Sequence, residues 1–181
     1  MAILESHDKF WGKVAIWGQY KPYSLHKEQG GDSSNYPGHS GKILDLKDDK
    51  AGAVHYFADL IEPELSAGIV IVTVPSHDPE SQSGGLKKLA ARLAENGNRV
   101  DGSSCLVRTQ KIGKLALGGD RSKEVHLKSL TVKDTALISG KDVLLLDDVA
   151  TSGNSLEAGK ELLLKAGARS VRRAAIGKTT P

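Results

Sequence analysis

Two adjacent carboxylates, Asp147 and Asp148, are the most informative residues of this 181-residue chain. They follow an apolar run, residues 143–146, that has the length and composition of a buried strand. After them comes a short loop of small and hydroxyl residues, 150–155, and then an amphipathic segment that begins at Leu156. This order of strand, acidic pair, loop and helix defines a candidate ligand site.

The chemistry of this site follows from its position at the end of a strand. In open α/β sheets, ligands bind beyond the carboxyl ends of the strands. A loop that opens a helix offers unpaired backbone N–H groups and the positive end of the helix dipole, and both favour an anion. Gly153 lets the backbone approach a phosphate, and nearby hydroxyls can donate hydrogen bonds. The two carboxylates accept hydrogen bonds, so the pattern suits a phosphorylated sugar.

The run resembles the phosphoribosyl pyrophosphate (PRPP) signature of type I phosphoribosyltransferases, which has four apolar residues, two acids and a Thr/Ser-Gly-x-Ser/Thr loop. The resemblance implies that the acid pair binds the ribose 2′- and 3′-hydroxyls and that the loop binds the 5′-phosphate. It assigns PRPP binding to Asp147, Asp148, Ala150, Thr151, Ser152, Gly153, Asn154 and Ser155. The alternative, a buried strand before an acidic helix N-terminus, leaves the Thr-Ser-Gly-Asn-Ser run unexplained.

A second candidate segment follows another apolar run. Residues 69–74 are rich in β-branched side chains, which is typical of a buried parallel strand, and Pro75, Ser76 and His77 come directly after them. In the family that the chain resembles, the loop at this point binds pyrophosphate, so the resemblance assigns that role to these three residues. A protonated His77 could donate to a pyrophosphate oxygen. The alternative is an ordinary surface histidine.

Residues 108–128 form a third candidate segment, which is basic and contains three glycines. A long loop inside a compact domain is usually functional or disordered. The resemblance implies a loop that closes over bound PRPP and excludes water from a reactive sugar cation. Arg108 and Arg121 join the acid pair as catalytic candidates, because guanidinium pairs bidentately with phosphate oxygens. The alternative is a solvated basic loop.

The hydrophobic pattern predicts an α/β fold. Strands and helices alternate from residue 51 onward, and this alternation predicts a central parallel sheet flanked by helices, the type I phosphoribosyltransferase fold. We assign residues 51–181 to this core domain and residues 1–50 to an irregular N-terminal hood. Within the hood, residues 14–17 and 43–46 are predicted strands of a small sheet, with a loop at 27–41 between them.

Composition narrows the class of protein. The net charge of +3 is mild and does not by itself indicate nucleic-acid binding. A single cysteine, Cys105, excludes an intramolecular disulfide and a cysteine-based zinc site, and we expect no metal site made by the protein alone. No apolar stretch reaches the length of a membrane helix and no signal peptide is visible. We therefore expect a cytoplasmic protein with no membrane contact.

Residues 43–178 are most similar to the ComF branch of competence-associated phosphoribosyltransferase-like proteins. The similarity rests on short runs at residues 43–47, 74–75, 106–110 and 121–125. Two features depart from that branch. The chain lacks a four-cysteine zinc module, and Gln82-Ser83-Gly84-Gly85-Leu86 stands where an Arg-Gly-Phe-Asn-Gln stretch is usual.

The resemblance implies an enzyme that transfers ribose 5-phosphate from PRPP to a nitrogen acceptor and releases pyrophosphate, with Mg²⁺ bound through PRPP. The aromatic residues Trp17, Tyr20, Tyr23 and Tyr36 could stack on an acceptor or could belong to a small core. The main alternative is a non-catalytic PRPP or nucleotide sensor, or a protein of DNA uptake or processing. The chain could also be one domain of a larger assembly. We expect a homodimer and at most weak binding to nucleic acid.

Overall fold

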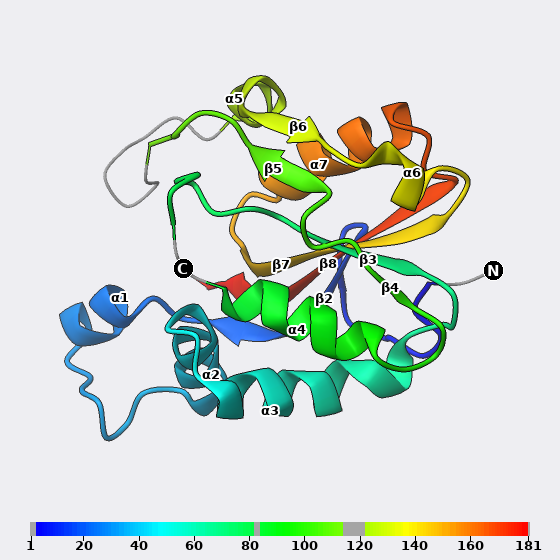
Figure 1. Cartoon of the computed structure of the whole chain (residues 1–181). Coiled ribbons are helices and arrows are strands. Elements are labelled where there is room, and N and C mark those ends of the chain that lie inside the picture. Colours follow the sequence, from blue (N-terminus) through cyan, green and yellow to red (C-terminus); the bar gives the residue numbers. More distant parts are fainter. Residues whose placement is uncertain (1–2, 82–83, 114–121, 181) are drawn as a thin grey trace.

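The computed structural model describes residues 3–81, 84–113 and 122–180, and its centre is a six-stranded sheet (Figure 1). The strand order is β1-β2-β8-β7-β3-β4, and every neighbouring pair except β1 and β2 is parallel. The strands are β1 (Phe10–Trp11), β2 (Val14–Tyr20), β3 (Val70–Thr73), β4 (Val100–Asp101), β7 (Asp142–Ala150) and β8 (Ser170–Thr179). The predicted α/β fold with a central parallel sheet is confirmed.

Helices cover both faces of the sheet (Figure 1). One face carries α2 (Gly38–Lys47), α3 (Ala51–Ile61) and α4 (Gly85–Ala94). The other carries α7 (Asn154–Lys165), α5 (Lys123–Ser129), α6 (Thr135–Ile138) and an antiparallel pair, β5 (Leu106–Arg108) and β6 (Leu130–Val132). The short helices α1 (Tyr23–Glu28) and η1 (Glu62–Glu64) complete the described elements.

The strand β7 shows how one sequence serves two cores. Leu144 and Leu146 belong to the hydrophobic cluster under α2, α3 and α4, whereas Val143 and Leu145 belong to the cluster under α7. Successive side chains of a strand point to opposite faces of the sheet, and helices cover both faces here, so all four side chains are fully buried. A central strand with both faces covered needs such a continuous apolar run. None of the helices in the described part of the chain has the length and hydropathy needed to span a bilayer.

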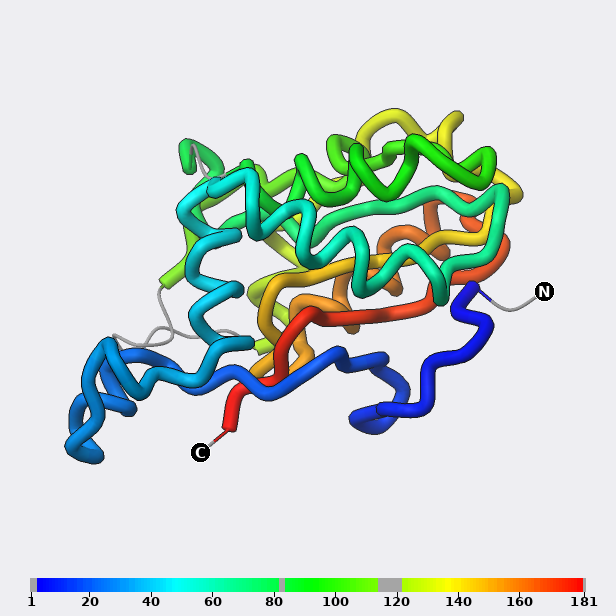
Figure 2. Tube along the Cα trace, turned by 90° about the horizontal axis from the view of Figure 1, so that it is seen from below, coloured from blue at the N-terminus to red at the C-terminus, as the bar shows by residue number. Residues whose placement is uncertain are grey.

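The predicted strand at residues 14–17 is part of β2, but the prediction that it forms a small sheet with residues 43–46 is wrong. Residues 43–46 belong to α2, in which Ile43 and Leu46 lie three residues apart on the buried face. The strand β2 pairs in parallel with β8, at the far end of the sequence (Figure 2). Four residues of mixed polarity fit a short strand and a helical turn equally well. The division at residue 50 stays a prediction, although α2 and α3 pack in one core.

The prediction of an irregular loop as far as residue 128 is also wrong, because residues 123–129 form the helix α5. The hydroxyl of Ser122 caps this helix by accepting from the backbone N–H of Val125, at 3.4 Å. The residues between 114 and 121 lie outside the described part of the chain.

Two helices on the same face of the sheet meet end to end. The helix α4 begins at Gly85, where an added Cβ would lie 1.9 Å from the carbonyl oxygen of Leu46 near the end of α2. Only a residue without a side chain permits this approach of the two backbones. Gly85 thereby determines how closely the end of α2, including Lys47, sits against the start of α4.

We expect Gly85→Ala to destabilise the protein by about 1–3 kcal/mol, because the backbone of one helix must move away from the other. The matched control is Gly52→Ala on α3, where an added Cβ meets nothing within 4 Å. In a helix, that control should be neutral or stabilise the protein by up to about 1 kcal/mol. Chemical denaturation of both variants measures the difference, and equal stabilities would contradict the proposed contact.

Candidate active site

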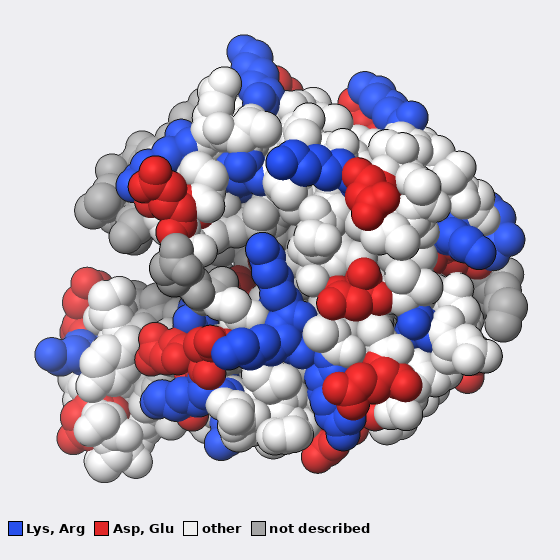
Figure 3. All heavy atoms as spheres, in the orientation of Figure 1, with Lys and Arg blue, Asp and Glu red and all other residues white. Residues whose placement is uncertain are grey.

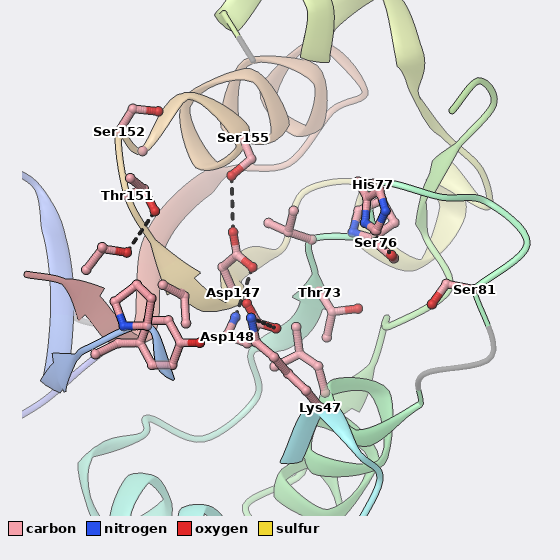
Figure 4. A pocket seen from close by; sticks show the side chains of 18 of the residues that line it. Lys47, Thr73, Ser76, His77, Ser81, Asp147, Asp148, Thr151, Ser152 and Ser155 are labelled. Atoms are coloured by element: carbon pink, nitrogen blue, oxygen red, sulfur yellow. Dashed lines mark hydrogen bonds and ion pairs between the residues drawn. The ribbon is translucent and has the colours of Figure 1, made fainter. Parts of the chain in front are cut away.

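The acid pair lies where β7 loses one of its neighbours. β3 pairs with β7 only as far as Thr73 opposite Leu146, whereas β8 continues beside β7 to Ala150. The side of β7 that faces β3 is therefore open from Asp147 onward. A pocket of about 690 Å³ occupies this opening, and both carboxylates line it (Figure 4). The pocket thus lies toward the carboxyl end of the central strand β7, where the sequence predicted a ligand site.

Two hydrogen bonds hold Asp147, and a lysine lies beside its neighbour Asp148. Its carboxylate accepts from the backbone N–H of Asp148 at 2.9 Å and from the hydroxyl of Ser155, in the first turn of α7, at 3.1 Å. The ammonium of Lys47, the last residue of α2, lies 3.4 Å from the carboxylate of Asp148 (Figure 4). Asp147 is buried, whereas the side chain of Asp148 is 28% exposed and faces the pocket. The two acids are therefore not equivalent.

The electrostatics of the pair follow from this burial. Burial and, second, the charge of Asp148 raise the pKa of Asp147 to about 7. For Lys47, burial acts to lower the pKa, but the negative charges of Asp148 and Asp147, with Tyr20, outweigh it and raise the pKa above its usual value. The site thus combines a buried carboxyl group that resists ionisation with an ammonium group that the neighbouring acids stabilise.

The loop between β7 and α7 forms one side of the pocket. Thr151, Ser152, Gly153 and Ser155 line it, whereas Ala150 is buried at the end of β7 and Asn154 begins α7. Gly153 has a φ of +79°, in the left-handed region that favours glycine. The loop, its glycine and the following helix therefore have the form expected of an anion site, with the first backbone N–H groups of α7 at one end of the pocket.

Pro75, Ser76 and His77 line the opposite side of the same pocket. In Figure 4 the acid pair lies between these residues and the β7–α7 loop. The three sets of residues that the sequence singled out, at 75–77, 147–148 and 151–155, are thus brought together. Their assignment to particular groups of a ligand stays a prediction.

Arg108 contacts the 75–77 loop and is buried, with 6% of its surface exposed. Its Nε donates to the backbone carbonyl of Ser76 at 2.6 Å, and its Nη1 donates to the hydroxyl of Ser129 at 2.6 Å. Its Nη2 lies 3.4 Å from Nδ1 of His126. Arg108 is not among the residues that line the pocket, and in this structure it holds the backbone of the 75–77 loop through Ser76. Arg121, the second predicted arginine, lies outside the described residues.

Lys47 and His126 are among the pocket residues that were not predicted from the sequence. Lys47 was not predicted because residues 43–46 were interpreted as a strand. In the structure they belong to α2, and Lys47 is the last residue of that helix. His126 comes from α5, where no helix was predicted. Of the aromatic residues considered as stacking partners, Tyr20 lines the pocket, whereas Trp17 is a core residue.

Comparison with known proteins agrees with this geometry. The family model described as the phosphoribosyl transferase domain matches residues 52–177, which is well over half of the chain. The chain belongs to the phosphoribosyltransferase family. No protein among the curated sequences matches it.

Several solved structures are similar to this chain. A hypoxanthine phosphoribosyltransferase from Staphylococcus aureus is 16% identical over 77% of this chain and 75% of its own, with a TM-score of 0.37. A purine phosphoribosyltransferase from Pyrococcus horikoshii Ot3 is 17% identical over 76% and 83%, with a TM-score of 0.36. The allosteric regulatory enzyme of purine biosynthesis is 20% identical, with a TM-score of 0.38, and the match covers 76% of this chain but only 24% of that one.

The raised pKa of Asp147 predicts how the stability of the protein depends on pH. Between the ordinary pKa of 3.8 and about 7, the folded protein keeps a proton that the unfolded chain releases. The stabilising contribution of Asp147 is therefore complete below about pH 4 and is lost as the pH rises through 7. Asp147→Asn keeps the shape and cannot ionise, so its stability relative to wild type should rise with pH, by about 1–4 kcal/mol in total.

Thermal melting from pH 5 to pH 8 measures this difference. Asp59→Asn, at an exposed position of α3, controls for the loss of one negative charge. A difference between Asp147→Asn and wild type that stays constant over this range would contradict the buried, proton-binding carboxyl group.

Proposed function

We propose that this protein binds PRPP and transfers its ribose 5-phosphate group to a nitrogen acceptor, with release of pyrophosphate. One observation carries the proposal: the acid pair lies in a single pocket between a helix-opening loop of hydroxyl residues and the loop at 75–77. Membership of the phosphoribosyltransferase family supports PRPP-dependent transfer in general.

In this proposal, a different group of pocket residues binds each of the three parts of PRPP. Asp148 and Asp147 would accept hydrogen bonds from the ribose hydroxyls, and residues 150–155 would bind the 5′-phosphate through backbone N–H groups and hydroxyls. Pro75, Ser76 and His77 would contact the pyrophosphate, with Arg108 fixing their backbone through Ser76. The bond from ribose C1 to the pyrophosphate oxygen breaks, and pyrophosphate leaves with the electron pair. The acceptor nitrogen forms the new bond to C1 and releases a proton to solvent.

Mg²⁺ is the expected ion of this reaction, and the pocket suits it as an ion carried by the substrate. Its walls offer carboxylate and hydroxyl oxygens, but no cluster of three or more His, Cys, Asp or Glu that could cage a metal occurs among the described residues. The ion would be held by PRPP oxygens and water, and the acid pair would act on it only through the ribose. When bound, it would neutralise charge on the pyrophosphate.

Asp148→Asn should weaken PRPP binding by about 1.5–3 kcal/mol for each hydrogen bond lost, because a charged acceptor is replaced by a neutral one. Isothermal titration calorimetry with Mg²⁺ measures the affinity, and pyrophosphate release with nucleobases and amines measures transfer. Equal PRPP affinity in wild type and the Asp147→Asn/Asp148→Asn double variant would contradict the proposal that the acid pair binds the ribose hydroxyls. Binding without pyrophosphate release from any acceptor would favour a PRPP sensor.

The resemblance to the ComF branch raises the question of DNA binding, and the charges argue for a weak interaction. Arg169 pairs with Asp142 and Arg173 pairs with Glu157, while Arg172 lies 4.5 Å over the ring of Phe10. Positive and negative side chains are interspersed on the face in Figure 3. Among the described residues of this face the charges are therefore mixed in sign, which disfavours tight binding of a phosphate backbone.

We therefore expect weak binding of single-stranded DNA that disappears near physiological salt. The logarithm of the binding constant should fall with the logarithm of the salt concentration, with a slope of about −0.7 for each phosphate neutralised. Fluorescence anisotropy over a salt series measures it. Submicromolar, salt-resistant binding would instead favour a role in DNA processing. The acceptor, the homodimer and a cytoplasmic location stay predictions.

A further inference from the structure

The pocket holds few permanent positive charges for a ligand as anionic as PRPP. Among the described residues that line it, only Lys47 and Lys87 carry one, beside the histidines 77 and 126. The loop at 75–77 has no lysine or arginine, and Arg108, which donates to the backbone of that loop, is not among the pocket-lining residues. The nearest described ammonium to the acid pair is that of Lys47.

The contact between Lys47 and Asp148 is long for an ion pair. The distance from its ammonium nitrogen to the carboxylate oxygen is 3.4 Å. The same distance is 2.6 Å between Lys50 and Asp45 and 2.5 Å between Lys88 and Asp49. Charge-assisted hydrogen bonds of this type are usually about 2.7–2.9 Å long. The Lys47 side chain is 38% exposed, and its ammonium also lies 5.4 Å from the centre of the Tyr20 ring. The contact of Lys47 with Asp148 is thus longer than the ion pairs that Lys50 and Lys88 make.

We propose that Lys47 is a substrate-binding residue whose ammonium changes partner, from Asp148 in the free protein to the pyrophosphate group when PRPP binds. This inference rests on the proposed function and adds to it a binding residue from α2, outside the three segments already assigned.

The exchange follows from the demands on Asp148. A ribose hydroxyl that donates to Asp148 competes with the ammonium for the same carboxylate, so an anionic group of the ligand in the same pocket becomes a stronger partner for the ammonium. The pyrophosphate is expected in the same pocket, and a flexible four-carbon stem with a compact charge suits a change of partner. Before the ligand enters, Lys47 reduces the negative charge of the acid pair and so lowers the repulsion of an incoming polyanion.

The test compares two ligands that differ only by the pyrophosphate group, PRPP and ribose 5-phosphate, by calorimetry in the presence of Mg²⁺. Lys47→Met keeps the length and packing of the side chain but removes the charge, and Lys47→Arg keeps the charge. Lys50→Met, which breaks an exposed ion pair three residues further on, is the matched control. Thermal melting checks that each variant is folded.

Lys47→Met should lower PRPP affinity by about tenfold or more, because one charge-assisted contact is lost. It should leave ribose 5-phosphate affinity unchanged or raised, because Asp148 loses a competitor. Lys47→Arg should restore most of the PRPP affinity, and Lys50→Met should match wild type. An equal loss for both ligands would mean that Lys47 only orients Asp148, and no loss for either would mean that it is not a binding residue; each result overturns the proposal. Wild-type protein that binds ribose 5-phosphate but not PRPP would refute the proposed function itself.

Discussion

Burial of Asp147 next to a second carboxylate is the constraint on which the rest of the site depends. A carboxylate in this position is unfavourable when ionised, as its raised pKa of about 7 indicates. The protein offsets this cost with contacts from three elements: the N–H of Asp148 on β7, the hydroxyl of Ser155 on α7 and the charge of Lys47 on α2. An acid pair that is costly for the fold is expected where the carboxylates serve a ligand.

The position of α2 follows from close contacts elsewhere. At Gly85 the start of α4 lies against the carbonyl oxygen of Leu46, and at Gly177 an added Cβ would lie 2.6 Å from Ile43. These two glycines let α2 pack directly on α4 and on β8. The end of the helix is thereby brought to the sheet edge where β7 loses β3, and Lys47 reaches the acid pair from there.

The sequence predicted the parts of the site that are local and failed where contacts are distant. The strand at 143–146, the acid pair and the loop at 150–155 are contiguous, so residue type and spacing were sufficient. Residues 43–46 were predicted as a strand, because a run of four residues is too short to distinguish the hydrophobic period of a strand from that of a helix. The pairing of β2 with β8 joins opposite ends of the chain.

The buried position of Arg108 also depends on distant partners. Ser76 and Ser129 are 32 and 21 residues away in sequence. A guanidinium in a basic, glycine-containing segment was reasonably expected to face solvent or an anion, and nothing local indicates that a carbonyl and a hydroxyl take its N–H groups. Arg121, the other predicted catalytic arginine, stays a prediction.

The central claim is that one pocket holds all three parts of PRPP around the acid pair. A crystal structure of the protein with PRPP and Mg²⁺ tests it most directly. We expect the ribose hydroxyls on Asp147 and Asp148, the 5′-phosphate against residues 151–155 and the pyrophosphate between residues 75–77 and Lys47. A ligand bound elsewhere, or in this pocket with its phosphate away from the β7–α7 loop, would contradict the account.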